Sequence, residues 1–288
     1  MRMKYLTIGL FVPLLLTACA GGNPIASLKT SHVHGLAVDR NDSNRVYIAT
    51  HDGLLAVQND TDLLRVGSSR DDFMGFSPHP TNPNILFSSG HPKGGGNIGF
   101  QQSNDKGETW KKISNGNPAG PADFHAMMAH PANPNHMYGW YKLRVHRSLD
   151  GGKTWEILQK QPPEVLSFAG DPTNANIVYI GTIGGLLMST DKGESWEKTT
   201  DVIGYDVIFD VETEPTGSLL LAMRDRGIVR ATIKNDRATL EDLGKLPSDD
   251  IPQHLALDTK NAEILYAFGK SLALYKSADG GKTWQKVL

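Results

Sequence analysis

The chain has 288 residues, of which 39% are hydrophobic and 30 are glycine, and its formal net charge is −2. This length can bury the core of one large or two small domains, and the charge leaves no basic footprint, so we expect no nucleic-acid partner. Cys19 is the only cysteine. A disulfide within the chain is therefore excluded, and the fold must be stabilised by packing.

The first residues have the features of a secretion signal. Two basic residues precede an apolar run over Tyr5–Leu16, which is too short to span a bilayer as a lasting helix. A Thr-Ala-Cys19 sequence follows, and together with Leu16 it resembles a bacterial lipobox. We predict a lipoprotein signal peptide over residues 1–18, lipidation of Cys19 and a tether over residues 19–27. The mature chain would then be anchored by lipid to a membrane of the cell envelope, outside the cytoplasm; an ordinary signal sequence is the alternative.

From residue 28 to residue 288 the sequence repeats one kind of unit. In the third unit, two apolar runs (Phe124–Ala129 and His136–Tyr141) flank a Pro- and Asn-rich turn at His130–Asn135. This layout is typical of short antiparallel strands. Six such units predict an all-β chain, folded as a six-bladed β-propeller of four-stranded antiparallel blades. A further short strand at Ser27–Ser31 is expected to help seal the ring.

Four units end in an eight-residue phrase with the pattern S-x-D-x-G-x-[ST]-W. The Asp is expected to accept hydrogen bonds from nearby backbone N–H groups, and the Gly to supply a left-handed position. The Trp supplies a large apolar body to bury between neighbouring blades. The structural pairs are Asp105 and Trp110, Asp150 and Trp155, Asp191 and Trp196, and Asp279 and Trp284. Decayed corners at Gln58–Asp62 and Lys234–Arg237 replace the phrase in units one and five.

This phrase resembles the Asp-box (BNR) repeat of β-propellers, which occurs in sialidases, sortilin-type receptors and photosystem II assembly factors. The chain beyond the signal also resembles bacterial BNR-propeller lipoproteins, which carry phrases similar to His32-Val-His-Gly-Leu and Asp123-Phe-His-Ala-Met. Such proteins are often called glycosyl hydrolase-like or sortilin-like. The resemblance implies the propeller fold and Asp-box turns, and it supplies no established substrate.

The strand order predicts which loops share a face. The start of strand one and the end of strand two lie on one face, around the mouth of the central channel, and the Asp-box turns lie on the other. We expect six histidines at the mouth: His32, His34, His51, His91, His125 and His254. Met74 and Asp206 are expected in the same column as His34. The connections that lead into strand one, on the same face, carry Asp71, Asp72, Asp123, Asp249 and Asp250.

Imidazoles combined with carboxylates and a thioether are suited to a transition-metal ion such as Cu or Zn. The first candidates for a metal or ligand site are His34, His51, His91, His125 and His254. The secondary candidates are His32, Met74, Asp123, Asp206 and Asp250. The alternatives are a general His-rich ligand pocket, unrelated polar groups lining a wet channel, and a packing role for Met74.

The sequence leads to three hypotheses for the function. The first is a lipid-anchored extracytoplasmic binding protein for a metal ion or small ligand, and the second is a scaffold that binds a protein partner. The third is a glycoside hydrolase of non-sialidase type, because the Arg-Ile-Pro motif of sialidases is missing from the sequence. No G-x-S-x-G, H-E-x-x-H or P-loop pattern is present. An enzyme is therefore the less expected class, and no catalytic residue is assigned.

Overall fold

The computed structural model describes residues 23–25, 27–28, 32–199, 203–234 and 237–288. The predicted signal peptide and the lipidation site Cys19 lie outside the described residues. Within these ranges the only helix is a three-residue 3-10 turn, η1 (Pro247–Asp249). No helix of the described part is long and apolar enough to cross a membrane.

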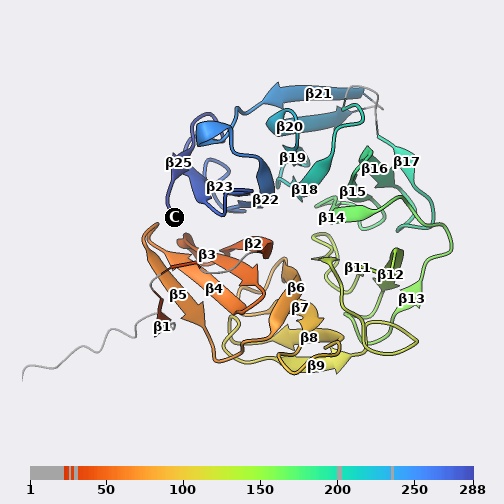
Figure 1. Ribbon diagram of the computed structural model, residues 1–288. Coiled ribbons are helices and arrows are strands. Elements are labelled where there is room, and N and C mark those ends of the chain that lie inside the picture. Colours follow the sequence, from red (N-terminus) through yellow and green to blue (C-terminus); the bar gives the residue numbers. More distant parts are fainter. Residues whose placement is uncertain (1–22, 26, 29–31, 200–202, 235–236) are drawn as a thin grey trace, which may run out of the picture.

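Six sheets form a ring around a central axis (Figure 1), which confirms the six-bladed β-propeller. Each blade is built from four consecutive strands in antiparallel order. The strands of blade one are β2 (Val33–Asp39), β3 (Asp42–Thr50), β4 (Gly53–Gln58) and β5 (Asp62–Val66). Those of blade two are β6 (Asp72–Pro78), β7 (Leu86–His91), β8 (Phe100–Ser103) and β9 (Lys111–Ser114). Those of blade three are β10 (Ala126–Ala129), β11 (Met137–Tyr141), β12 (Arg144–Ser148) and β13 (Glu156–Ile157).

The second half of the ring repeats this order. Blade four contains β14 (Val165–Gly170), β15 (Val178–Thr182), β16 (Gly185–Ser189) and β17 (Glu197–Lys198). Blade five contains β18 (Ile208–Thr213), β19 (Leu219–Met223), β20 (Gly227–Lys234) and β21 (Arg237–Asp242). Blade six contains β22 (Pro252–Leu257), β23 (Leu265–Gly269), β24 (Leu274–Ser277) and β25 (Gln285–Lys286). The first strand of every blade is innermost, and it contacts the first strands of both neighbouring blades.

The N-terminal segment adds a fifth strand to blade one. β1 (Asn23–Pro24) pairs with the outer strand β5, so part of the segment expected as a tether is attached to the sheet. Most of the expected strand at Ser27–Ser31 lies outside the described residues. The ring is closed by packing of blade six on blade one, near the C-terminus (Figure 1), where Phe268 and Leu274 join one hydrophobic cluster with Val46 and Ile48.

The hydrophobic core is divided into six clusters, one at each interface between adjacent blades. The box tryptophans pack at four of these interfaces. Trp110, for example, packs against a cluster that joins Leu54 of blade one to Phe73 of blade two. The prediction that the Trp residues pack between neighbouring blades is therefore confirmed. Full burial of one large apolar side chain contributes about 1.5–3 kcal/mol to stability.

Each Asp box is a closed network of hydrogen bonds. In the second box, the Thr154 N–H and hydroxyl donate to Asp150 at 2.9 and 2.7 Å, and the Ser148 hydroxyl donates at 2.8 Å. Burial acts to raise the pKa of Asp150, but the hydrogen bonds together outweigh it and lower that pKa to about 2. Gly152 has φ +83°, and a Cβ there would lie 2.1 Å from Phe100 Cε1 of the preceding blade. Only glycine satisfies both the backbone angle and the packing.

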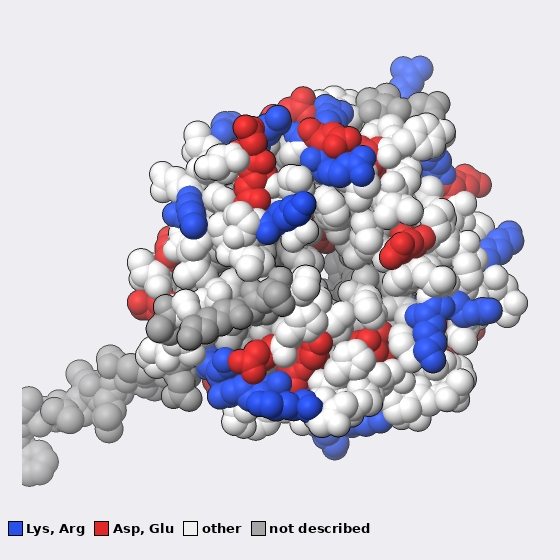
Figure 2. Space-filling view, in the orientation of Figure 1, with Lys and Arg blue, Asp and Glu red and all other residues white. Residues whose placement is uncertain are grey.

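The box turns lie on the face opposite the channel mouth. The Gly151 N–H donates to the Asn135 carbonyl in the turn between strands one and two of the same blade, at 2.9 Å. Equivalent bonds run from Lys106 to Asn84, from Lys192 to Asn176 and from Gly280 to Glu263. The sequence-based assignment of the two faces is therefore confirmed. Figure 2 shows charged side chains of both signs spread over one face of the ring, around a central hollow.

Candidate functional site

The inner strands carry a bulge where they begin, at the channel mouth. The residue displaced from the pairing is His34 in β2, Leu166 in β14, Phe209 in β18 and Gln253 in β22. In β6 the irregular stretch between Phe73 and Phe76 contains Met74, as predicted, and Met74 is buried. The expectation for Asp206 is corrected, because Phe209 takes the position equivalent to His34. Bulges redirect side chains, and they are frequent beside functional sites.

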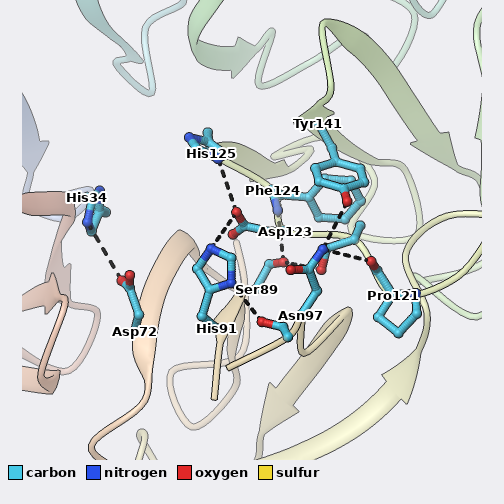
Figure 3. Close-up of polar contacts among 12 residues, drawn as sticks. His34, Asp72, Ser89, His91, Asn97, Pro121, Asp123, Phe124, His125 and Tyr141 are labelled. Atoms are coloured by element: carbon cyan, nitrogen blue, oxygen red, sulfur yellow. Dashed lines mark hydrogen bonds and ion pairs between the residues drawn. The ribbon is translucent and has the colours of Figure 1, made fainter. Parts of the chain in front are cut away.

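The first cluster at the mouth is formed by His34, His51 and Asp72. The Nε2 atoms of the two imidazoles lie 3.3 Å apart. His51 Nδ1 lies 2.5 Å from Asp72 Oδ2, and His34 Nε2 lies 3.7 Å from Asp72 Oδ1. One ligand atom from each residue lies within 4.8 Å of the other two, and this is the only such group among the described residues. Figure 3 shows His34 and Asp72 facing one another across the mouth.

The electrostatic setting keeps His34 in the form that binds metals. Burial, and after it the positive charges of His51 and other nearby histidines, lowers the pKa of His34 to about 3. His34 is therefore neutral at pH 7, and a neutral imidazole is a metal ligand. Asp72 Oδ1 is buried and has no hydrogen-bond partner. An unpaired carboxylate oxygen beside two imidazoles is an unsatisfied negative charge, which a cation would neutralise.

The second cluster joins His91 and His125 through Asp123. Both imidazole Nε2 atoms approach Asp123 Oδ2, at 2.9 and 3.1 Å (Figure 3). The side chain of Asp123 is only 5% exposed, and its Oδ1 has no partner. The Phe124 N–H donates to Ser89 Oγ at 3.0 Å, which fixes Asp123 beside the loop that carries His91.

His91 lies between two acceptors. Its Nδ1 lies 2.7 Å from the Gly96 carbonyl and its Nε2 lies 2.9 Å from Asp123. A neutral imidazole has one donor, so in that form it can donate to only one of the two acceptors. The hydrogen bond to Asp123 also raises the pKa of His125. This cluster therefore favours positive charge, whereas His34 in the first cluster is held neutral.

The other predicted histidines have different surroundings. His254 Nε2 lies 2.8 Å from the Val33 carbonyl, so it links blade six to blade one at the ring closure. Burial lowers the pKa of His254 to about 4. His32 is exposed, and its ring centroid lies 5.3 Å from that of His51. The five first candidates are thus divided: His34 and His51 meet, His91 and His125 meet at Asp123, and His254 is separate.

The two remaining carboxylate candidates belong to the blades opposite. Asp250 accepts hydrogen bonds from the Ser271 N–H and hydroxyl and from the Tyr275 hydroxyl, at 3.0, 2.5 and 3.0 Å. Asp206 accepts the Asp225 N–H at 3.0 Å. No histidine contacts either carboxylate among the described residues, so both have loop-fixing geometry rather than the geometry of the His clusters.

Sequence reasoning placed Asp72 at the mouth without choosing it as a candidate. Asp72 can be recognised from its position in the repeat. In five blades a carboxylate residue either begins strand one or lies one to three residues before it, as Asp72, Asp123, Glu164, Asp206 and Asp250. Because the start of strand one lies beside the end of strand two in the preceding blade, His51 meets Asp72 and His91 meets Asp123.

Comparison with known proteins supports the fold and gives partial similarity to enzymes. A model of the BNR/Asp-box repeat matches residues 275–286, which contain the whole fourth box. A probable oligoxyloglucan-reducing end-specific xyloglucanase of Neosartorya fischeri is 29% identical over 133 residues, which cover 41% of this chain and 16% of that protein. Xyloglucanase Xgh74A of Acetivibrio thermocellus is 27% identical over 201 residues, which cover 54% of this chain and 24% of that enzyme. The chain spans less than a quarter of the length of these two relatives.

Solved structures share the architecture at low identity. The GH74 enzyme of Niastella koreensis superposes with a TM-score of 0.64 and 17% identity, over 92% of this chain and 45% of that enzyme. YCF48 bound to D1 peptide superposes with a TM-score of 0.53 and 16% identity, over 92% of this chain and 88% of that one. These likenesses confirm an Asp-box propeller and do not by themselves carry a function.

Proposed function

We propose that this chain is a lipid-anchored, extracytoplasmic binding protein whose channel mouth binds a transition-metal ion. His34 and His51 are the imidazole ligands, and Asp72 is the carboxylate beside them. The observation that carries this proposal is the 3.3 Å separation of the two Nε2 atoms. Two imidazole ligands of one tetrahedral zinc ion, each at about 2.0–2.1 Å, are separated by about 3.4 Å.

The surroundings of the two imidazoles add to this geometry. The contact between His51 Nδ1 and Asp72 resembles the carboxylate–histidine pairs that fix the tautomer and orientation of metal ligands. If Nδ1 carries the proton, Nε2 of His51 presents its lone pair toward His34. Imidazole and carboxylate ligands suit Zn and Cu(II). Two or three protein ligands leave at least one position for water or a bound molecule, which favours a ligand-binding or transfer role over a closed structural site.

Metal titration of the intact propeller tests the site. The non-lipidated variant Cys19→Ser is titrated with Zn²⁺ and Cu²⁺ at pH 7 by calorimetry, and compared with the same chain carrying His34→Gln and His51→Gln. The matched control is His79→Asp on the opposite face, where Asp171 occupies the equivalent turn position of blade four and accepts the same kind of N–H bond as His79. We expect one tight site that is lost in the double variant and kept in the control. Equal binding by all three chains would refute the site.

The lipid anchor requires a separate test. The Leu-Thr-Ala-Cys19 sequence supports it, and lipidation at a signal-peptide cysteine would attach the chain firmly to a membrane. The mass of the full chain extracted from membranes should correspond to loss of residues 1–18 and addition of a lipid on Cys19. A mature chain with a free N-terminal residue other than Cys19 would contradict the anchor.

A glycoside hydrolase is the second candidate, and the partial similarity to two xyloglucanases favours it. Glycoside hydrolysis commonly uses two carboxyl groups, and Asp72, Asp123 and Asp206 are carboxylates at the mouth that each have one buried oxygen without a hydrogen bond. The test is release of reducing ends from xyloglucan and its oligosaccharides. Turnover that is abolished by Asp123→Asn would support an enzyme, and turnover that survives this change, or none, would count against it.

A further inference from the structure

A second cavity opens in the channel at the end opposite the histidine clusters. It has a volume of about 360 Å³ and is lined by the later residues of the innermost strands and the turns that follow them, from all six blades. Phe76, Met127 and Phe168 give its wall an apolar character. Because the turns between strands one and two lie on the Asp-box face, this cavity is separate in the fold from the His34 site and independent of it.

One side of this cavity carries a guanidinium with unused donors. Arg40 Nη1 donates to Thr259 Oγ1 at 3.1 Å, whereas Nε is buried without a partner. Arg40 forms no ion pair among the described residues. Burial lowers the pKa of Arg40, although a guanidinium stays charged at neutral pH. A buried guanidinium N–H without an acceptor is costly, and a bound anion would reduce that cost.

The neighbouring polar groups of the cavity are compatible with a bound anion. Glu212 lines the cavity and makes no hydrogen bond among the described residues, and the hydroxyl of Thr213 is buried without a partner. Burial, and next the charge of Asp210, raises the pKa of Glu212. Glu212 and then Asp258 attract the Arg40 guanidinium, and Arg40 in turn acts to lower the pKa of Glu212. The pKa of His79 is lowered chiefly by burial and then by Arg40. The buried Thr213 hydroxyl is a donor from which a bound anion could accept.

We propose that this cavity binds the carboxylate of a small apolar acid, with Arg40 on the carboxylate and the tail against Phe76, Met127 and Phe168. A planar guanidinium matches a carboxylate in a bidentate arrangement. A concave, mostly apolar cavity with a few convergent polar groups is the usual form of a small-molecule site, and its volume is within the usual range of roughly 300–1,000 Å³. The carboxylate belongs either to a free acid or to the C-terminus of a peptide with an apolar last residue.

Calorimetry on the Cys19→Ser chain at pH 7, with chelator present, tests this proposal without reference to the metal site. The probes are hexanoate, hexanol and hexylammonium, which share a tail and differ in charge. We expect hexanoate to bind most tightly, and Arg40→Gln to weaken it at least tenfold while hexanol is unaffected. Arg40→Lys keeps the positive charge but loses the planar guanidinium, so its affinity for hexanoate should be intermediate. Thermal unfolding of both variants checks that they are folded.

Further measurements decide whether the bound carboxylate belongs to a free acid or to a peptide C-terminus, and some results would overturn the proposal. A pentapeptide ending in leucine, compared with its C-terminal amide, tests the peptide source: tighter binding of the free acid than of hexanoate assigns the site to a peptide terminus, and weaker binding assigns it to a free acid. The proposal is wrong if hexanoate does not bind, if hexylammonium binds more tightly, or if folded Arg40→Gln binds hexanoate as well as the unchanged chain does.

Discussion

The channel mouth has two halves, formed by blades one to three and by blades five and six. Both halves carry a carboxylate near the start of strand one, but the groups that contact this carboxylate differ. In blades one to three, Asp72 and Asp123 face imidazoles, and each keeps one buried oxygen without a partner. In blades five and six, Asp206 and Asp250 accept hydrogen bonds from backbone N–H groups, and Asp250 also accepts from two hydroxyls. Asp206 Oδ1 is also buried without a hydrogen bond, but the group near it is Arg224 Nε at 4.0 Å and not an imidazole. Backbone and hydroxyl donors fix a loop, whereas an imidazole can exchange its proton for a metal ion. The backbone repeat therefore sets where a carboxylate lies, and its neighbours decide whether it can take part in binding.

The largest expected effect concerns the two imidazoles of the first half. His34→Gln combined with His51→Gln removes both nitrogen ligands, and we expect metal affinity to fall at least about 100-fold, since each lost ligand or oriented partner is worth about tenfold or more. The measurement is competition with a chromophoric chelator. A matched change in the other half, Ser271→Ala, should leave metal affinity unchanged. An equal loss of metal affinity in the Ser271→Ala variant would show that the two halves do not differ in metal binding.

The variants Asp72→Asn and Asp250→Asn compare a carboxylate expected to support metal binding with one expected to support stability. Asp72→Asn should weaken metal binding by about 10–100-fold, because the partner of His51 Nδ1 is altered, with little change in stability. Asp250→Asn replaces an oxygen that accepts from two hydroxyls and should lower the free energy of unfolding by about 1–3 kcal/mol. Urea unfolding and metal titration of both variants measure this, and the reverse pattern would show that the halves are assigned the wrong way round.

One histidine from each half, His254 and His125, should make contributions to stability that depend on pH with opposite sign. The pKa of His254 falls from 6.5 to about 4 on folding, chiefly through burial. Its contribution to stability is therefore full above about pH 6.5 and is lost as the pH falls toward 4. The pKa of His125 is raised, chiefly by its hydrogen bond to Asp123, so its contribution is full below the unfolded pKa and is lost as the pH rises through the folded value.

Two variants separate these contributions in metal-free protein. His254→Gln should reduce the loss of stability between pH 7 and pH 5, and His125→Gln should be more destabilising at pH 5 than at pH 8. The urea midpoint at each pH is the readout. If His125→Gln destabilised the chain more at pH 8, the charged form of His125 would not be the favoured one, and the proposed character of the second cluster would be wrong.

The smallest effect is expected at Asp206. Its Oδ2 accepts one N–H, from Asp225, and an asparagine oxygen can do the same. Asp206→Asn should therefore change the free energy of unfolding by no more than about 0.5 kcal/mol and leave metal affinity unchanged. A clear loss of metal binding in this variant would extend the site across the channel and erase the contrast between the halves.

The fold was predictable from the sequence because the repeat carries its own register. Four intact boxes fix the period, and in the second box Asp150, Gly152 and Trp155 make the contacts that their chemistry requires. The strand order then predicts the two faces. The short strand β1 on blade one was not predicted, because two residues such as Asn23–Pro24 have no hydrophobic period to detect.

The site was predictable only to the level of the face. The bulged residue at the start of the inner strand is His34 in β2, but it is Gln253 in β22, one residue before His254, and Phe209 in β18, three residues after Asp206. A one-residue shift is invisible in the sequence pattern yet turns a side chain to the other side of a strand. The pairing of His51 with Asp72 depends on contact between neighbouring blades, and no spacing along the chain encodes that contact.

The central claim is that one metal ion lies between His34 and His51, and anomalous diffraction from crystals loaded with Zn²⁺ tests it most directly. We predict a peak at the zinc edge about 2.0–2.2 Å from the Nε2 atoms of both residues, with Asp72 beside it and no peak at Asp206 or Asp250. A peak at His79 or His136 alone, on the opposite face, or no peak at the mouth at saturating zinc, would contradict the claim.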